Sequence, residues 1–319
     1  MGQHLLNVKE LTLDHISELL QRAAFYEKNY QYLDAPIRKR FVANLFLEPS
    51  TRTKISFEIA EKRLGLETIS FSSATSSLLK GETLYDTLKT MEKQGIEVAV
   101  IRLKEEGQLS ALSQKLKLRI VNAGEGTVEH PTQALLDLYT IKKYFQDLKG
   151  LNVAIIGDIA HSRVAHSNYH LLKKLGANVV FSGPSFFMDK NLEGKVLPID
   201  AAINQADVVM MLRVQFERLN DKITISQEEY NKQFGFTADR LAILPSHSII
   251  LHPAPVNRGM EMDDQVVEHQ QSKIFEQVEN GVWIRMAVIE RALGGDQQWQ
   301  SSFKMAASGL RSNGLMGIS

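Results

Sequence analysis

Phe41-Val42-Ala43-Asn44-Leu45-Phe46 runs directly into Leu47-Glu48-Pro49-Ser50-Thr51-Arg52-Thr53, and this stretch decides the fold. Its first six residues form a short apolar run that is typical of a buried strand. Ile55, Ile59 and Ala60 then follow at helical spacing, which predicts a helix immediately after the turn. A strand that leads through a turn into a helix is the repeating unit of an α/β fold.

Further apolar runs alternate with helical patterns along most of the chain. The runs that read as strands are 98–101, 120–121, 153–156, 179–181, 208–212 and 249–251. Strands that alternate with helices pair in parallel and are covered on both faces. The sequence therefore predicts an α/β protein with doubly wound parallel sheets, and its 319 residues suit two such domains.

The boundary between the two domains is expected near residue 131. The segment 133–145 is apolar on nearly every face, which is typical of a helix buried between domains. Gly150 then precedes a strand that begins a second sheet. We expect a first domain at 1–131, a second at 132–281, and a C-terminal helix in 282–319 that packs back on the first. The two domains are thus joined by buried helices.

Composition narrows the class of partner and the location. Lys+Arg and Asp+Glu both number 37, so the formal net charge is zero, which argues against nucleic acid or an anionic membrane as partner. The absence of cysteine excludes disulfides, thiolate metal sites and cysteine nucleophiles. The first residues lack the basic-then-apolar pattern of a signal peptide, and no apolar run is long enough to span a bilayer. The expected location is cytoplasmic.

The turn after the first strand has the composition of an anion site. Ser50 or Thr51 can cap the following helix, whose free N–H groups and positive dipole end attract an anion. Arg52 adds a planar fork that matches phosphate oxygens. The alternative is simply a capped helix with an arginine on its surface.

Other strand ends favour the anion site. Ligands of open α/β sheets bind at the carboxyl ends of the strands. Polar residues follow five further strands: Arg102; His130-Pro131-Thr132-Gln133; Arg163; Arg213-Val214-Gln215; and His252-Pro253-Ala254-Pro255. Arginines after four strands of a neutral protein predict a cleft for several anionic groups, such as one phosphate and two carboxylates.

Several common chemistries have no signature in this chain. The dinucleotide fingerprint, the NTPase phosphate loop and the G-x-S-x-G elbow are all absent. His166 and His170 stand four residues apart, and we favour packing or helix-surface histidines over a metal pair. No metal and no cofactor is therefore predicted. Arginines with one histidine and no nucleophile fit direct transfer, with electrostatic stabilisation of an oxyanion.

Five motifs together identify a family. They are Phe46-Leu47-Glu48-Pro49-Ser50-Thr51-Arg52-Thr53, Lys80-Gly81-Glu82-Thr83, His130-Pro131-Thr132-Gln133, Arg213-Val214-Gln215 and His252-Pro253-Ala254-Pro255. With these motifs in order, the sequence resembles the aspartate carbamoyltransferases over nearly its whole length. These are the catalytic chains of the second step of pyrimidine synthesis.

The resemblance implies a role for each matching residue. Carbamoyl phosphate is expected to bind first and L-aspartate second, and the amine of aspartate then attacks the carbonyl carbon without a cofactor. The residues implied for carbamoyl phosphate are Ser50, Thr51, Arg52, Thr53, Ser76, Arg102, His130, Gln133, Ala254 and Pro255. Those implied for aspartate are Lys80, Arg163, Arg213 and Gln215. Arg52, Thr53, Lys80, Arg102 and His130 form the implied catalytic set.

The resemblance also gives a meaning to the serine-rich segment 72–77, which composition alone would place in a flexible surface turn. In the family the corresponding loop enters the active site of the neighbouring subunit, and Ser76 and Lys80 match the contributing positions. A homotrimer with shared active sites is thus implied. Three assemblies stay open: trimers joined to regulatory chains, trimers associated with dihydroorotase, and trimers alone.

Three alternatives compete with this interpretation. The ornithine carbamoyltransferases share the chemistry of the first domain, but they typically carry a Ser-Met-Gly loop and a cysteine that this chain lacks. Arg213 favours a carboxylate over an amine on the second substrate. A non-catalytic scaffold relative is expected to lose phosphate or loop residues, all of which are present. Finally, His130 could be a buried histidine with a structural role only.

Overall fold

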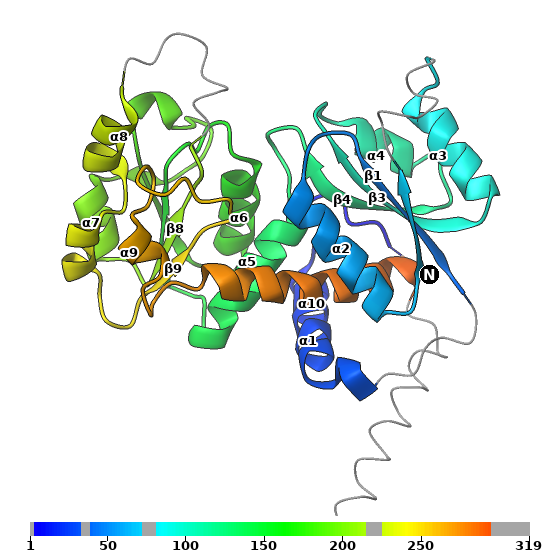
Figure 1. Ribbon diagram of the computed structural model, residues 1–319, viewed down its shortest axis with the longest axis horizontal. Coiled ribbons are helices and arrows are strands. Elements are labelled where there is room, and N and C mark those ends of the chain that lie inside the picture. Colours follow the sequence, from blue (N-terminus) through cyan, green and yellow to red (C-terminus); the bar gives the residue numbers. More distant parts are fainter. Residues whose placement is uncertain (1–2, 33–38, 72–80, 215–224, 295–319) are drawn as a thin grey trace, which may run out of the picture. The chain divides into compact units, whose positions relative to one another are not determined.

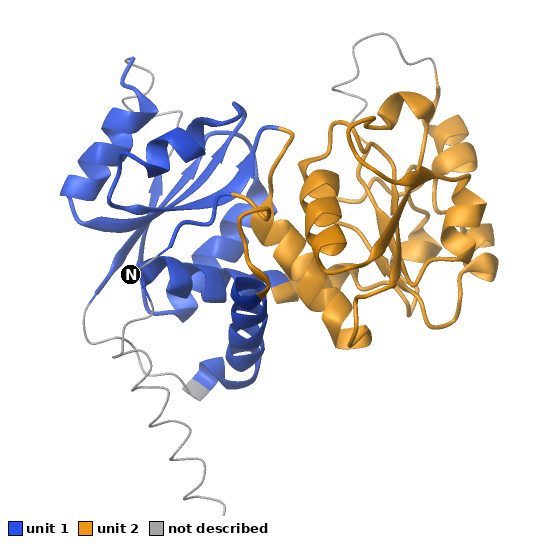
Figure 2. Cartoon of the chain, turned by 180° about the vertical axis from the view of Figure 1, so that it is seen from behind, with its two compact units in different colours: residues 1–6, 14–126, 281–319 blue, residues 7–13, 127–280 orange. Residues whose placement is uncertain are grey.

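The structure is a computed structural model that describes residues 3–32, 39–71, 81–214 and 225–294. These residues form two compact units (Figure 2). Unit 1 contains the described residues of 1–6, 14–126 and 281–319, and unit 2 contains those of 7–13 and 127–280. None of the described helices has both the length and the apolar composition that crossing a membrane requires.

Unit 1 is built on a four-stranded sheet in the order β2-β1-β3-β4, of which β1, β3 and β4 are labelled in Figure 1. The strands are β1 (Phe41–Phe46), β2 (Glu67–Phe71), β3 (Ile96–Leu103) and β4 (Arg119–Glu125). Every neighbouring pair is parallel. The central strands are apolar on both faces because helices cover both sides, as parallel sheets require.

Alternate residues of β1 show the two helical layers. Ala43 and Leu45 pack with Leu88 of α3 (Leu84–Lys93) and Leu109 of α4 (Gln108–Ser113). Asn44 points to the other face, where its amide donates to Glu61 of α2 (Thr51–Arg63) at 2.8 Å. Unit 1 also contains α1 (Leu13–Asn29), the short η1 turn (Tyr30–Tyr32) and the end of α10 (Ile274–Leu293).

The end of α10 is tied into unit 1 by polar contacts. Arg22 donates to both carboxylate oxygens of Glu290, at 2.5 and 2.7 Å. Arg285 donates to the hydroxyl of Ser56 at 2.9 Å, and Trp283 lies against Tyr30. The helix of the C-terminal segment thus belongs to unit 1 from Gly281 onward.

Unit 2 has a five-stranded parallel sheet in the order β7-β6-β5-β8-β9. Its strands are β5 (Asn152–Ile156), β6 (Asn178–Ser182), β7 (Lys195–Val196), β8 (Val208–Met211) and β9 (Ile249–Leu251). Its helices are α5 (Pro131–Tyr144), α6 (Arg163–Lys174), α7 (Ile199–Asn204), α8 (Gln227–Phe234) and α9 (Asp264–Val267), with the η4 (Ser185–Phe187) and η6 (Ala238–Ile243) turns. Figure 1 shows α6 on the opposite side of the sheet from α7 and α9.

These sheets confirm the predicted fold class, two α/β domains with parallel sheets. The predicted runs fall within β1, β3, β4, β5, β6, β8 and β9, although β8 ends one residue early, at Met211. The helix α5 is buried at every position from Pro131 to Ile141, as its apolar sequence predicts. The expected division at 131/132 and 281/282, with its functional assignments, stays a prediction.

Glu61 is a buried carboxyl in the α2 layer of unit 1. Its Oε2 accepts from Asn44 and Thr68, at 2.8 and 2.9 Å. Burial is nevertheless the larger influence, and it raises the pKa of Glu61 from an ordinary 4.5 to about 7. Between these values the unfolded chain has lost the proton that the folded chain keeps. Folding stability therefore falls as the pH rises through this interval.

Replacing Glu61 with Gln is expected to remove this loss. The Tm of Glu61→Gln minus that of the wild type should be larger at pH 8 than at pH 5. Between pH 5 and pH 8, the stability of the variant relative to the wild type should rise by roughly 3 kcal/mol of unfolding free energy. Thermal unfolding at the two pH values measures it. Glu18→Gln, at an exposed position of α1, is the matched control, and an equal Tm difference at both pH values for Glu61→Gln would contradict the assignment.

Candidate active site

At the carboxyl edge of the unit 1 sheet, the turn that leads to Arg52 starts next to Arg102. Phe46, the last residue of β1, pairs with Arg102 near the end of β3. The contact continues past the strand, because the Leu47 N–H donates to the Arg102 carbonyl at 2.8 Å. The turn that carries Ser50 to Thr53 therefore begins beside Arg102.

The start of α2 lacks a side-chain cap. Ser50 occupies the N-cap position with extended backbone, but its side chain makes no capping hydrogen bond. The predicted side-chain cap is thus absent, and the correction has a physical consequence. The first-turn N–H groups and the Ser50 hydroxyl do not hydrogen-bond to each other, so both can donate to a bound anion. Thr51 and Arg52 are exposed at the same helix start.

A carboxylate from the same turn holds Arg102. Glu48 Oε1 lies 2.8 Å from Nε of Arg102, and both side chains are about 15% exposed or less. An arginine has five N–H donors in a planar fork, so this contact orients the fork without exhausting it. Sequence reasoning did not single out Glu48, although its place two residues before Ser50 was a usable signal.

In unit 2, His130 is fixed at the N-cap position of α5, with Pro131 as the first helical residue. The His130 N–H donates to Ser167 Oγ at 2.9 Å, and that hydroxyl donates to Glu129 at 2.8 Å. His130 is 4% exposed. The backbone of His130 is therefore anchored to α6, and its imidazole sits at the positive end of a helix dipole.

Gln133 lies one turn further along α5. Its Nε2 donates to Asp137 Oδ1 at 2.8 Å, across the i, i+4 spacing that brings side chains to one helix face. Gln133 is 8% exposed and Asp137 is fully buried. His130 and Gln133 are thus presented by the same first turn of α5.

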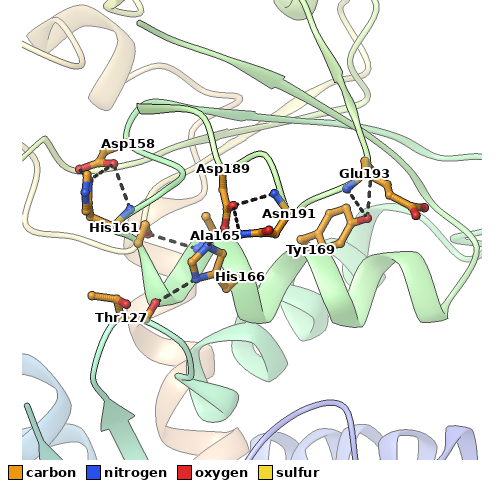
Figure 3. Close-up of polar contacts among 10 residues, drawn as sticks. Thr127, Asp158, His161, Ala165, His166, Tyr169, Asp189, Asn191 and Glu193 are labelled. Carbon is orange, nitrogen blue, oxygen red and sulfur yellow. Dashed lines mark hydrogen bonds and ion pairs between the residues drawn. The ribbon is translucent and has the colours of Figure 1, made fainter. Parts of the chain in front are cut away.

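Arg163 is the first residue of α6. Figure 3 shows polar contacts of Asp158, His161 and Ala165 near the start of this helix. The Ser162 hydroxyl caps the helix by accepting from the Ala165 N–H at 3.2 Å. In the preceding loop, Asp158 accepts from the His161 N–H at 3.1 Å and lies 2.9 Å from its ring. Burial raises the pKa of Asp158, and the neighbouring His161 opposes this rise.

His166 joins three segments of unit 2 (Figure 3). Its Nδ1 lies 3.0 Å from the Thr127 carbonyl and its Nε2 lies 3.1 Å from Asp189. Burial and the nearby Lys9 lower the pKa of His170 to about 4. Across the described ranges, no group of three or more His, Asp or Glu side chains could hold a metal ion. His166 thus links α6 to the segments that carry Thr127 and Asp189.

Arg213 follows β8 and lies in a turn that is bonded to the segment after β9. Asn257 donates from Nδ2 to the Val214 carbonyl at 2.9 Å. Gly157, after β5, suits this place, because its φ of 128° is one that residues with side chains rarely adopt and a Cβ would lie 3.1 Å from Cβ of Leu212. Arg213 thus lies at the carboxyl edge of the unit 2 sheet, two residues after β8 ends.

Ala254 has a backbone conformation that side-chain-bearing residues seldom adopt, with φ of 52°. A hydrogen bond supports it, since the Ala254 N–H donates to Nδ1 of His252 at 2.8 Å. His252 is 1% exposed, and its Nε2 lies 3.3 Å from the buried carboxylate of Glu261. The turn at Ala254-Pro255 is therefore held from within by the residue at its start.

The predicted residues fall into two groups, each assembled within its own unit. Ser50, Thr51, Arg52, Thr53 and Arg102 lie in unit 1, whereas His130, Gln133, Arg163, Arg213, Ala254 and Pro255 lie in unit 2. Ser76, Lys80 and Gln215 lie outside the described residues.

Comparison with known proteins gives a consistent result for both halves of the chain. Residues 3–143 match the carbamoyl-P binding domain of aspartate/ornithine carbamoyltransferases. Residues 149–291 match the Asp/Orn binding domain of the same family. Aspartate carbamoyltransferase catalytic subunits of Listeria monocytogenes and Listeria innocua are 48% and 49% identical over 294 residues, covering 91% of this chain and 96% of the relative.

Solved structures agree with the sequence matches. Aspartate transcarbamoylase of Trypanosoma cruzi in complex with N-(phosphonacetyl)-L-aspartic acid is 26% identical with a TM-score of 0.82, covering 91% of this chain and 95% of that one. Ornithine carbamoyltransferase of Pyrococcus furiosus is 25% identical with a TM-score of 0.82, covering 92% and 98%. On these matches over both halves of its sequence, the chain belongs to the aspartate/ornithine carbamoyltransferase family.

Proposed function

We propose that this chain transfers the carbamoyl group of carbamoyl phosphate to the amine of L-aspartate. The products are N-carbamoyl-L-aspartate and phosphate, and the reaction belongs to de novo pyrimidine biosynthesis in the cytoplasm. The observation that carries the proposal is the presence of arginines at or after the carboxyl ends of strands in both sheets, Arg52 and Arg102 in unit 1 and Arg163 and Arg213 in unit 2. Such cations suit a substrate pair with one phosphate and two carboxylates.

The choice of aspartate over ornithine rests on the second unit. The relatives at 48% and 49% identity are named aspartate carbamoyltransferase catalytic subunits. Arg213 also suits a carboxylate, whereas it would repel the ammonium group of an ornithine side chain. Arg163, Arg213 and Gln215 are proposed to bind the two carboxylates of aspartate.

Carbamoyl phosphate is proposed to bind first, through its phosphate. The N-terminus of α2 supplies backbone N–H groups, Ser50, Thr51 and Thr53 supply hydroxyls, and Arg52 neutralises charge. Ser76 is proposed to reach the same phosphate. The uncapped state of Ser50 supports this role, because its hydroxyl has no competing bond within the helix start.

The reaction itself needs no covalent enzyme intermediate. The neutral amine of aspartate attacks the carbonyl carbon, and negative charge grows on the carbonyl oxygen. Thr53, Arg102 and His130 are proposed to stabilise this charge. The bond from carbon to the phosphate oxygen then breaks, and the leaving phosphate accepts the proton that the amine releases. Orientation of the two substrates contributes much of the acceleration.

Gln133 and the backbone of Ala254 and Pro255 are proposed to bind the amide end of the carbamoyl group. An oxygen acceptor is what an NH2 group needs, and both elements can offer one. Lys80 is proposed to contribute to the aspartate site and to catalysis from a neighbouring subunit of a homotrimer.

The purified chain is expected to form N-carbamoyl-L-aspartate and one equivalent of phosphate from carbamoyl phosphate and L-aspartate. With L-ornithine in place of aspartate, turnover should be at least about 10³-fold lower, because Arg213 rejects the amine. Product formation followed by chromatography checks both substrates. Citrulline formation at a comparable rate would reverse the assignment within the family, and no product from either acceptor would identify a non-catalytic relative.

Replacing His130 with Ala is expected to lower kcat about 10²- to 10³-fold, the usual cost of removing one oxyanion donor. Steady-state kinetics measures the loss, and thermal unfolding checks that the variant is folded. His247→Ala, at an exposed histidine of unit 2, is the matched control and should retain full turnover. If His130→Ala instead loses thermal stability while its folded fraction keeps the wild-type kcat, the histidine has a structural role only.

Mixing the inactive variants Arg52→Ala and Lys80→Ala tests for shared sites. In a random 1:1 mixture, three quarters of the trimers contain both chains, and each of these has one native site in three. Recovery of about a quarter of wild-type activity is therefore expected after dissociation and reassembly. Arg52→Ala mixed with the double variant Arg52→Ala/Lys80→Ala supplies the control, which should stay inactive. Fully mixed trimers without recovered activity would place both residues on one chain.

A further inference from the structure

A buried carboxylate that the mechanism does not use lies behind the amide-binding residues. Asp137 of α5 is fully buried, and three side-chain amides donate to it. Gln133 donates to Oδ1 at 2.8 Å, Gln277 donates to Oδ1 at 2.7 Å, and Asn168 donates to Oδ2 at 2.7 Å. Three N–H donors from three helices compensate the burial of this charge.

The carboxylate determines which end of the Gln133 amide faces it. An ionised carboxylate accepts hydrogen bonds and cannot donate them, so the NH2 end of Gln133 must face Asp137. The amide is planar, which turns its oxygen away from Asp137. Among the described residues that oxygen has no hydrogen-bond donor. Asp137 therefore presents Gln133 outward as an acceptor.

A second path leads from Asp137 to the turn at Ala254. Gln277 donates to Asp137, and its own oxygen accepts from the His252 N–H at 2.9 Å. His252 in turn accepts from the Ala254 N–H through Nδ1 at 2.8 Å. In this series of hydrogen bonds, Asp137 orients the Gln277 amide, and the Gln277 oxygen in turn holds the backbone of His252. It ends at the residue with φ of 52°, where the backbone needs support.

We propose that Asp137 is a positioning residue that turns both acceptors, the Gln133 oxygen and the carbonyl groups of the Ala254-Pro255 turn, toward the NH2 group of carbamoyl phosphate. The inference rests on the proposed function. It explains how the site distinguishes a carbamoyl group from an acyl group of the same shape. Only the carbamoyl NH2 can donate to these acceptors, whereas a methyl group in its place leaves them unpaired.

The test compares two ligands that differ only at this position. Phosphonoacetamide carries the amide NH2, and acetonylphosphonate carries a methyl group instead. Calorimetric titration of the full chain gives a Kd for each, and their ratio measures discrimination. The wild type should bind phosphonoacetamide at least about tenfold more tightly, as expected for one or two hydrogen bonds.

Asp137→Asn is expected to reduce this ratio toward one while changing the Kd of acetonylphosphonate by less than about threefold. The new NH2 group permits Gln133 to turn its oxygen inward, so that a donor faces the ligand. Asp137→Asn should also add no further loss of discrimination in a Gln133→Ala/Gln277→Met background, because both paths are already broken. Gln277→Met alone interrupts only the path to Ala254 and should give an intermediate ratio, which tests the inference even if Asp137→Asn does not fold.

Asn280→Ala is the matched control. This buried amide lies on the same helix, three residues after Gln277, but it donates to Thr140 at 2.9 Å. It should lower thermal stability and leave the ratio unchanged.

Equal weakening of both ligands in Asp137→Asn and Gln277→Met would overturn the inference, since damage to packing alone acts on both. So would an unchanged ratio in these variants, or a wild-type ratio near one. Failure of the proposed function has a different signature. The wild type would then discriminate between the two ligands yet form no carbamoyl aspartate.

Discussion

The parallel pairing of strands is the constraint on which the rest of this structure depends. In unit 1, pairing places the end of β1 beside Arg102 of β3, although the two lie far apart in the sequence. In unit 2, the same rule brings the ends of β5 and β8 together, since Ile156 pairs with Met211. Residues that follow these strands lie at the same carboxyl edge of the sheet, because parallel pairing in this register aligns the strand ends. A chain of zero formal net charge can thereby concentrate cations locally.

The sequence predicted central strands better than edge strands, and the reason is burial. The runs in β1, β3, β5 and β8 are continuous because helices cover both faces, so their composition stands out. The strand β2, Glu67–Phe71, lies at the sheet edge with no fully buried residue, and its mixed polar composition carried no strand signal. The two-residue strand β7 is exposed and too short to detect. The helix α10 begins at Ile274, whereas the sequence predicted a start near Val282. The early start was missed because the first turns include polar residues, such as Gln277 and Asn280, that are buried with hydrogen-bond partners.

In the candidate site, too, some residues could be predicted from the sequence and others could not. Arginines and hydroxyls that follow strands are visible in a sequence, because their position relative to an apolar run implies their position on the sheet. Orientation is not visible. Ser50 reads as a helix cap, yet only the structure shows that its hydroxyl makes no hydrogen bond to the first turn of α2. Asp137 and Gln277 are 140 residues apart, and nothing in either local pattern indicates that they bond. Short-range pattern thus finds the charged groups, whereas the buried partners that aim them depend on the complete fold.

This division also has a chemical meaning for the proposed reaction. A guanidinium binds phosphate and carboxylate alike, because its fork of N–H donors matches the oxygens of both groups. Cations at the strand ends can therefore gather a phosphate and carboxylates, but they cannot distinguish an amide from a methyl group. That distinction needs neutral acceptors held at a fixed angle, and a neutral side-chain amide can rotate unless something fixes it. A buried carboxylate fixes it at low cost in stability only when every bond is made, as the three donors to Asp137 illustrate. Affinity and selectivity are thus supplied by different groups, arginines at the strand ends and a buried, hydrogen-bonded carboxylate behind Gln133.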